Sequence, residues 1–253
     1  MEHAGDKQRS VVLVTGATGG LCAGVAERLA QVGYRVVVAT RHGGGDPAAV
    51  LARMRAFDPG AGAQCFDWDD PAAVDLALQQ LEATHGPLYA AIHGRGPMKI
   101  GLLQRSTRED AQLMLAENLM SGILLAQAVL PGMRARGTGR LLFFGMTGSS
   151  VTRPARGLAL YGAAKAGLVA FARTLALEEA AAGITVNVLE PGDIRDKTSS
   201  REQAQRVPAA NPTGHAGSWE DIADAACFLL SPQASFINGS VLGIGGGLTN
   251  ASE

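Results

Sequence analysis

The sequence is poor in several features that define common classes of protein. Aromatic residues make up only 5% of its 253 residues, and no apolar run approaches the roughly 18 residues that a membrane-spanning helix needs. Lysine and arginine number 22 against 23 aspartates and glutamates, so the basic excess typical of nucleic-acid-binding proteins is missing. Residues 1–10 are polar and charged, unlike the apolar core of a signal peptide. We therefore expect a soluble, cytoplasmic protein that binds neither nucleic acid nor a membrane.

Cysteine is also scarce, and its spacing argues against two further classes. Cys22, Cys65 and Cys227 are far apart and form no CxxC pair, so neither a zinc site nor a disulfide framework is indicated. We interpret them as small buried apolar residues and expect no metal site. By contrast, glycine is abundant, with 33 residues, but without the every-third-residue repeat of collagen.

Short apolar runs alternate along the chain with segments of helical periodicity. The runs typical of β-strands cover residues 10–15, 34–39, 88–92, 140–144, 184–189 and 241–244. Capping residues mark helix starts between them: Ser106 with Glu109, and Asp70 before Pro71. This alternation predicts an α/β fold, a Rossmann-type doubly wound parallel sheet with helices on both faces. Residues 1–253 are expected to form a single domain.

One long stretch, residues 192–217, has neither helical nor strand periodicity. A loop of this size in a compact domain is usually functional or mobile. We interpret it as a substrate lid, with moderately hydrophobic residues such as Val207 and Trp219 available to an organic substrate.

A glycine-rich turn, Gly16-Ala-Thr-Gly-Gly20, joins the first predicted strand to the first predicted helix. Backbone N–H groups in such a turn and the positive end of the helix attract a pyrophosphate, and glycines allow a close approach. A tight turn that binds nothing would need similar residues. The turn therefore gains weight from its place on the first strand of an alternating chain.

Four later segments accompany this turn. They are Asn118, Tyr161-x3-Lys165, Ile184–Asn187 and Pro191-Gly192. Together with Thr15–Gly20 they resemble, in the same order, the short-chain dehydrogenase/reductase family. The resemblance extends over nearly the whole chain, and the layout is most similar to that of 3-oxoacyl-(acyl carrier protein) reductases.

The resemblance implies a dinucleotide cofactor held by several segments. The expected contacts are Gly16, Thr18, Gly19, Gly20, Leu21, Arg41, Asp67, Trp68, Gly94, Tyr161, Lys165, Pro191, Gly192 and Ile194. Arg41 stands where an acidic residue would bind the ribose hydroxyls of NAD, and an arginine there accommodates a 2′-phosphate. We therefore expect NADP(H), the alternative being a surface arginine beside a flexible glycine loop. Asp67 would meet the adenine, unless it is only a loop or helix-capping residue.

Tyr161 and Lys165 lie four residues apart on a predicted helix and therefore share a face. The resemblance makes Tyr161 the general acid or base, although an unperturbed phenol has a pKa of about 10. The Lys165 ammonium and a cationic nicotinamide would lower that pKa, and Asn118 would support a bound water that relays protons to the lysine. The alternative is an amphipathic helix with an unrelated tyrosine and lysine.

The chain departs from the family beside the expected cofactor. Cys22 replaces the third glycine of the turn, and His93-Gly94-Arg95-Gly96 replaces Asn-Asn-Ala-Gly. The arginine of this segment, Arg95, either contacts a phosphate or an anionic substrate, or points outward. The histidine is interpreted as a strand-end residue rather than a catalyst. Glu190 stands where a small residue is usual, and we consider Arg95 and Arg195 as its partners.

The family's catalytic serine has no clear equivalent. Ungapped alignment of the strand expected at residues 140–144 places Met146 there, whereas counting back from Tyr161 reaches Gly148, so a small insertion is implied. The available hydroxyls belong to Thr147, Ser149 and Ser150. Thr147 is our first choice and Ser149 the second. A third possibility is that Tyr161 alone orients the substrate.

These features predict an NADP(H)-dependent oxidoreductase, a ketoreductase or alcohol dehydrogenase, with Tyr161, Lys165, Asn118 and Thr147 as catalytic residues. The substrate is expected to be a small-molecule or carrier-bound carbonyl compound. Related proteins pair through the helices that hold Asn118 and Tyr161, which implies a homodimer or homotetramer. The alternative is a weakly active or inactive dinucleotide-binding protein that acts as a sensor or subunit, because fold alone does not establish activity.

Overall fold

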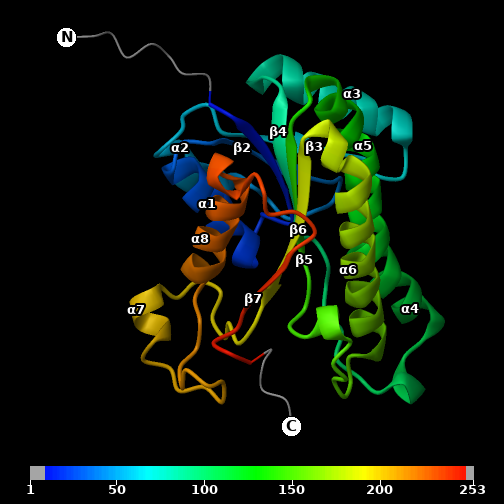
Figure 1. The fold of residues 1–253 in the computed structure, drawn as a ribbon, viewed down its shortest axis with the longest axis vertical. Coiled ribbons are helices and arrows are strands. Elements are labelled where there is room, and N and C mark those ends of the chain that lie inside the picture. The colour runs from blue at the N-terminus through cyan, green and yellow to red at the C-terminus, as the bar shows by residue number, and fades with distance from the viewer. Residues whose placement is uncertain (1–8, 249–253) are drawn as a thin grey trace.

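The computed structural model describes residues 9–248, which contain a seven-stranded sheet whose neighbouring strands are all parallel (Figure 1). Its strand order is β3-β2-β1-β4-β5-β6-β7. The strands are β1 (Val11–Thr15), β2 (Arg35–Thr40), β3 (Gly62–Cys65), β4 (Leu88–His93), β5 (Gly139–Phe144), β6 (Ile184–Pro191) and β7 (Val241–Ile244). The predicted α/β, Rossmann-type sheet is confirmed. Most of the polar N-terminal segment lies outside the described residues.

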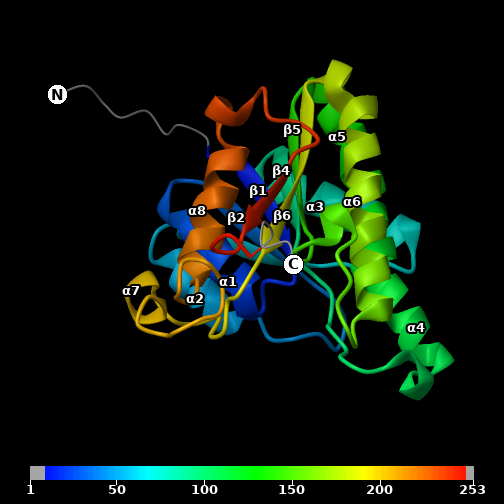
Figure 2. The same cartoon turned by 60° about the horizontal axis from the view of Figure 1, so that its bottom comes forward.

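Helices cover both faces of this sheet, as a parallel sheet requires. They are α1 (Gly20–Gln31), α2 (Ala48–Arg55), α3 (Pro71–His85), α4 (Arg108–Leu115), α5 (Ser121–Arg136), α6 (Ala159–Glu179), α7 (Arg201–Ala204) and α8 (Trp219–Leu230). One face packs against α3, α5 and α6, and the other against α1, α2 and α8 (Figures 1 and 2). Leu125 and Leu168 fill the first layer, and Leu29 and Leu229 fill the second.

Two helical stretches, Arg108–Arg136 and Ala159–Ala182, are long and apolar enough to cross a membrane by length and composition. The first joins α4 to α5 through a π-helical turn, Ala116–Met120. In the fold both stretches lay apolar side chains on the sheet, and Leu125 and Leu168 are fully buried there. The core therefore accounts for their apolar composition.

The long helix begins one residue later than predicted. Thr107, not Ser106, is the N-cap, because its side chain accepts a hydrogen bond from the backbone N–H of Asp110 at 3.2 Å. Asp110 in turn accepts a bond from the backbone N–H of Thr107 at 3.0 Å. The cap at Asp70 is confirmed, since its carboxylate accepts bonds from the first turn of α3.

The order of the strands reverses at β1, which has β2 on one side and β4 on the other. Ligands of open α/β sheets bind beyond the carboxyl ends of the strands at such a point. The glycine turn lies here, and Gly16 has a φ of +72°, which L side chains rarely adopt. A Cβ at this position would also lie 2.7 Å from the carbonyl oxygen of Gly94. The turns after β1 and β4 can therefore meet only because residue 16 is glycine.

Candidate active site

A cleft of about 1040 Å³ opens at the carboxyl ends of the strands. Most of the expected site residues line it: Gly16, Gly19, Gly20, Leu21, Arg41, Gly94, Thr147, Tyr161, Lys165, Pro191 and Gly192. They come from segments far apart in sequence, which the parallel sheet brings to one edge. The arrangement that the motifs predicted is thus assembled in one place.

A second cavity of about 480 Å³ shares Arg41 with this cleft. It contains Asp67 and Trp68, which follow β3. The ring of Trp68 stacks on that of Phe66, with centroids 4.9 Å apart and planes 13° apart. The Asp67 carboxylate accepts a bond from the backbone N–H of Asp69 at 3.2 Å. A planar apolar wall beside a carboxylate suits an aromatic base that carries an amino group.

Three expected site residues lie outside the lining of these two cavities. Thr18 faces Gly45, where an added Cβ would be 2.7 Å from its hydroxyl. Ile194 packs against the core layer of α1 and α8. Asn118 is fully buried in the π-helical turn and donates to the carbonyl oxygen of Pro97 at 3.0 Å. Its Oδ1 has no hydrogen-bond partner among the described residues, so it remains available to a water molecule.

The start of α1 can accept an anionic group. No side chain caps this helix at Gly19, and a Cβ added there would meet nothing within 4 Å. The free N–H groups of the first turn therefore face open space in the cleft, as a phosphate site requires. Lys197 also lines the cleft, and its Cδ lies 3.6 Å from the point where Gly20 would carry a Cβ. Lys197 was not identified from the sequence, because residues 192–217 show no regular pattern.

Tyr161 and Lys165 project from the first turns of α6 into the cleft. The Lys165 ammonium lies 5.6 Å from the centroid of the Tyr161 ring and donates to the carbonyl oxygen of Phe144 at 2.7 Å. Burial lowers the pKa of Lys165 to about 8, because desolvation penalises its charged form. Burial also raises the pKa of Tyr161. The expected lowering of the Tyr161 pKa is therefore absent from the protein without its cofactor.

Glu190 organises the loop that was expected to supply a catalytic hydroxyl. Its carboxylate is 1% exposed and accepts bonds from the backbone N–H of Gly148 at 3.1 Å and the Ser149 hydroxyl at 2.6 Å. Ser150 donates to the same carboxylate through its backbone N–H and its hydroxyl. Ser149, our second choice for the catalytic hydroxyl, and Ser150 therefore both donate their hydroxyl protons to Glu190.

The partners suggested for Glu190 were wrong. Arg195 pairs with Asp193 at 3.1 Å, and Arg95 pairs with Glu117. Because β5 pairs directly with β6, the loop that follows β5 lies beside the end of β6. The donors of this loop therefore satisfy the Glu190 carboxylate.

Of the residues considered for the serine position, only Thr147 and Met146 line the cleft. The Thr147 hydroxyl donates to the carbonyl oxygen of Pro191 at 2.6 Å. Because this bond uses the hydroxyl proton, the Thr147 oxygen can only accept a hydrogen bond from a further group. The methionine places a soft apolar thioether where the family alignment puts the serine.

Cys22 and Gly94 are two departures from the family that fit each other. Cys22 is buried, and its Sγ lies 1.9 Å from the point where Gly94 would carry a Cβ. Burial raises the pKa of the Cys22 thiol to about 12, so it remains protonated. Cys65 and Cys227 are only partly buried. The expectation that the cysteines are buried therefore holds for Cys22 alone.

His93 ends β4 and is 1% exposed, as expected of a structural strand-end residue. Its Nε2 lies 2.8 Å from the Ser121 hydroxyl, which donates to the carbonyl oxygen of Glu117 at 2.7 Å. Nε2 therefore carries the proton and donates. Burial lowers the pKa of His93 to about 3, and the ring stays neutral near pH 7.

Arg95 lines the cleft rather than pointing outward, and its contact with a phosphate or an anionic substrate stays a prediction. It bonds to both carboxylate oxygens of Glu117, whose Oε1 also lies 3.2 Å from Nη1 of Arg41. All three residues line both cavities. Glu117 was not identified from the sequence, because it belongs to none of the motifs.

Several residues that line the cleft outside the cofactor motifs are apolar. The lining residues beyond these motifs include Met98, Leu113, Arg153, Pro154, Ala155, Leu158 and Leu248. Val207 and Trp219, which were expected to face a substrate, do not line the cleft. Trp219 instead packs on α1, where a Cβ at Gly24 would lie 2.6 Å from its ring. The glycine in α1 leaves room for the indole, so this side chain belongs to the core.

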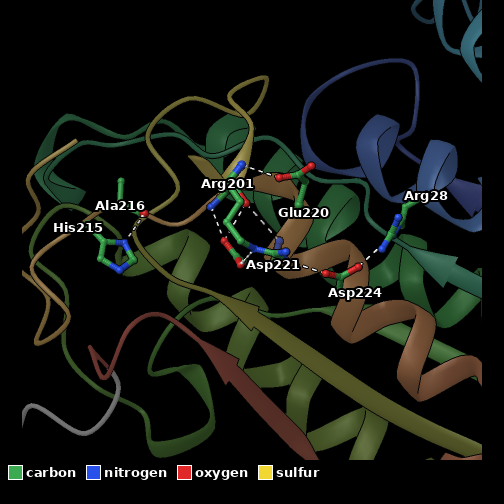
Figure 3. Close-up of polar contacts among 8 residues, drawn as sticks. Arg28, Arg201, His215, Ala216, Glu220, Asp221 and Asp224 are labelled. Atoms are coloured by element: carbon green, nitrogen blue, oxygen red, sulfur yellow. Dashed lines mark hydrogen bonds and ion pairs between the residues drawn. The ribbon is translucent and has the colours of Figure 1, made fainter. Parts of the chain in front are cut away.

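The segment 192–217 is tied to the body of the protein near its middle. Arg201 of α7 pairs with Asp221 and Asp224 of α8, each at 2.7 Å (Figure 3). Asp224 also pairs with Arg28 of α1 at 3.0 Å. The part before α7, which contains Lys197, is the part that reaches the cleft.

Comparison with known proteins agrees with this geometry. A family model described as enoyl-(acyl carrier protein) reductase matches residues 16–249. A 3-oxoacyl-(acyl-carrier-protein) reductase of Escherichia coli K12 is 34% identical over 242 residues, covering 94% of this chain and 96% of the relative. The chain therefore belongs to the short-chain dehydrogenase/reductase family.

Other relatives support the same assignment. A 3-oxoacyl-(acyl-carrier-protein) reductase of Mycobacterium bovis is 32% identical over 243 residues, covering 94% of this chain and 92% of the relative. Among solved structures, a single-site variant of actinorhodin polyketide ketoreductase with NADPH has a TM-score of 0.84 and 27% identity, covering 96% of this chain and 98% of that chain. Levodione reductase has a TM-score of 0.83, 27% identity and the same coverages.

Proposed function

We propose that the protein is an NADP(H)-dependent carbonyl reductase or alcohol dehydrogenase with Tyr161 as its general acid or base. The observation that carries the proposal is the shared cleft, which is lined both by Tyr161 and Lys165 and by the uncapped start of α1. The relatives, which are 3-oxoacyl reductases, and the NADPH-bound ketoreductase structure support it.

The residues of the chain fit a dinucleotide. The amides of Gly19 and Gly20 and the Lys197 ammonium would hold the pyrophosphate. Trp68 and Asp67 would hold the adenine, and Arg41 the 2′-phosphate. Gly192 lines the same cleft as Tyr161, and the nicotinamide would lie between them.

The bound cofactor supplies or accepts the hydride, and the protein supplies the proton. In reduction, the Tyr161 hydroxyl donates its proton to the developing alkoxide, leaving a phenolate that the Lys165 ammonium stabilises. A proton relayed through Lys165 and a water held by the Oδ1 of Asn118 then restores the phenol. Thr147, whose own proton is bonded to Pro191, would accept a hydrogen bond from the hydroxyl of the alcohol, which is the product of reduction and the substrate of oxidation. Oxidation follows the same path in reverse.

The substrate is proposed to be a small-molecule or carrier-bound carbonyl compound. The apolar lining residues Met98, Leu113 and Leu158 suit an organic carbon chain. Residues 192–217 form the lid over the cleft in the proposal, within a single domain that spans 1–253. Homo-oligomeric assembly and a cytoplasmic location belong to the same proposal.

Replacement of Tyr161 by phenylalanine tests the proposed function. The variant retains the ring but loses the proton, so NADPH oxidation with diketones, quinones or acyl thioesters should fall by at least about 100-fold. Tyr34→Phe, which removes a hydroxyl outside the cleft, serves as the matched control and should retain activity. Substantial turnover by Tyr161→Phe would contradict the assignment. Tight NADPH binding by the wild type without turnover of any substrate would instead favour a sensor or subunit.

A further inference from the structure

Three charged side chains meet where the two cavities join. Arg41 follows β2, Arg95 follows β4, and Glu117 lies in the π-helical turn beside Asn118. Glu117 binds both guanidinium groups. Its side chain is 15% exposed and that of Arg95 is 19% exposed, so water screens their charges only partly. We refer to Arg41 and Arg95 as the arginine pair.

The contacts of Glu117 with the arginine pair are unequal. Arg95 engages both oxygens of the carboxylate, whereas Arg41 reaches only Oε1, at 3.2 Å. Arg41 is also the more exposed arginine, with 54% of its side chain accessible. Arg95 is therefore the main counter-ion of Glu117, and Arg41 is the member that an incoming anion can capture.

We infer that Glu117 and Arg95 together set the affinity of Arg41 for the 2′-phosphate of the cofactor. The carboxylate competes with a phosphate for Arg41 and repels it, while Arg95 neutralises most of that repulsion. Glu117 thus lowers the affinity for a 2′-phosphorylated ligand, and Arg95 limits the loss. This inference rests on the NADP(H) assignment of the proposed function.

Glu117→Gln removes the competing charge and keeps nearly the same shape. The dissociation constant of NADPH should fall by at least about threefold, while that of NADH should change less. Fluorescence titration of both nucleotides measures this at fixed ionic strength. Adenosine 2′,5′-bisphosphate and adenosine 5′-monophosphate, measured by calorimetry, give the same comparison without the nicotinamide. Glu178→Gln on the exposed far end of α6 removes the same charge elsewhere and controls for net charge.

Arg95→Met supplies the complementary test. It leaves Glu117 without its main counter-ion, so the carboxylate should hold Arg41 and repel the 2′-phosphate. NADPH should bind at least about tenfold more weakly. Adding Glu117→Gln to this variant should recover most of the loss, which direct contact of Arg95 with the nucleotide would not allow. Circular dichroism confirms that each variant is folded.

The outcomes separate this inference from the cofactor assignment. The ratio of the NADPH and NADH dissociation constants in Glu117→Gln, relative to wild type, reports on Glu117 alone. A wild type that binds NADH as tightly as NADPH would contradict the NADP(H) assignment. An unchanged ratio in Glu117→Gln, or a double variant as weak as Arg95→Met, would overturn the role of Glu117.

Discussion

The Cys22 sulfur lies where a Cβ on residue 94 would be. The cysteine at position 22 therefore requires the glycine at position 94. The family has a glycine at the first position and an asparagine at the second. Here the cysteine side chain fills the space that a residue with a Cβ at position 94 would need. The two departures from the family therefore compensate each other: the larger residue at position 22 takes the space that the smaller residue at position 94 leaves.

Gly94→Asn should destabilise the protein, because its Cβ would overlap the Cys22 sulfur. Overpacking of this kind costs about 1–3 kcal/mol. Cys22→Gly in the same chain should restore most of the stability, because it reopens the space. Urea unfolding of the two single variants and the double variant measures the coupling. Additive losses in the double variant would contradict the exchange.

The buried ammonium of Lys165 should make stability depend on pH in a defined window. Its pKa is about 8 in the folded protein and 10.5 as its ordinary value, so the unfolded chain binds more protons between these values. The free energy of unfolding of wild type should therefore rise relative to that of Lys165→Met as pH increases from about 8 to 10.5, by at most about 3 kcal/mol. Below pH 8 the difference should be constant. Paired urea unfolding curves check this, and a falling difference would contradict it.

At the scale of elements, residues 192–217, which we propose to be a lid, contain a short helix that is held in place by other elements. The four residues of α7 cannot form a stable helix alone. The ion pairs of Arg201 with α8 position it, and the hydrogen bonds with Asp221 and Asp224 raise the pKa of the guanidinium. The segment that carries Lys197 to the cleft is thus fixed at its far end by α8.

Arg201→Met should loosen the lid more than it destabilises the fold. Its ion pairs are partly exposed and contribute no more than about 1 kcal/mol each. We expect faster hydrogen exchange in residues 193–205 and weaker NADPH binding, with little change in the core helices. Arg206→Met, which breaks only the exposed pair with Glu202, is the matched control. Equal exchange in the two variants would argue against an anchor at Arg201.

Most elements were predictable from the sequence because their signals are local, but the short elements β3 and α7 were not. The patterns that predict strands, helix caps and the glycine turn each involve only a few neighbouring residues. The motifs likewise identified Tyr161 and Lys165. The polar partners were not predictable in this way. Arg95 bonds to Glu117 at a separation of 22 residues, and Ser149 to Glu190 at 41. Only the folded sheet decides which of several nearby charges meet.

At the scale of the whole molecule, the outer face of α6 remains partly apolar. Leu177 is 82% exposed, and Ala170 is exposed on the same helix. The core is already filled on the opposite side of α6, so these residues contribute nothing to it. Apolar surface of this kind is suited to contact with a second copy of the chain.

We expect wild type to be a homo-oligomer that Ala170→Glu converts to smaller species. The carboxylate would be buried without a partner at the interface, which disfavours association. Size-exclusion chromatography with light scattering gives the mass of each variant. Val32→Glu, which changes an exposed residue beyond α1, should leave the mass unchanged. A monomeric wild type would exclude the assembly.

The contact between Gly192 and the end of β7 has a consequence for the order in which the cleft forms during translation. The backbone N–H of Gly192 donates to the carbonyl oxygen of Ile244 at 2.9 Å, and a Cβ on Gly192 would lie 2.3 Å from the Cα of Gly245. The cleft wall beside Tyr161 is therefore completed by nearly the last described residues to be synthesised. During translation, the glycine turn and its helix emerge more than 200 residues earlier. A growing chain can thus shape its phosphate-binding end first, and it completes its reactive end only after β7 has been synthesised.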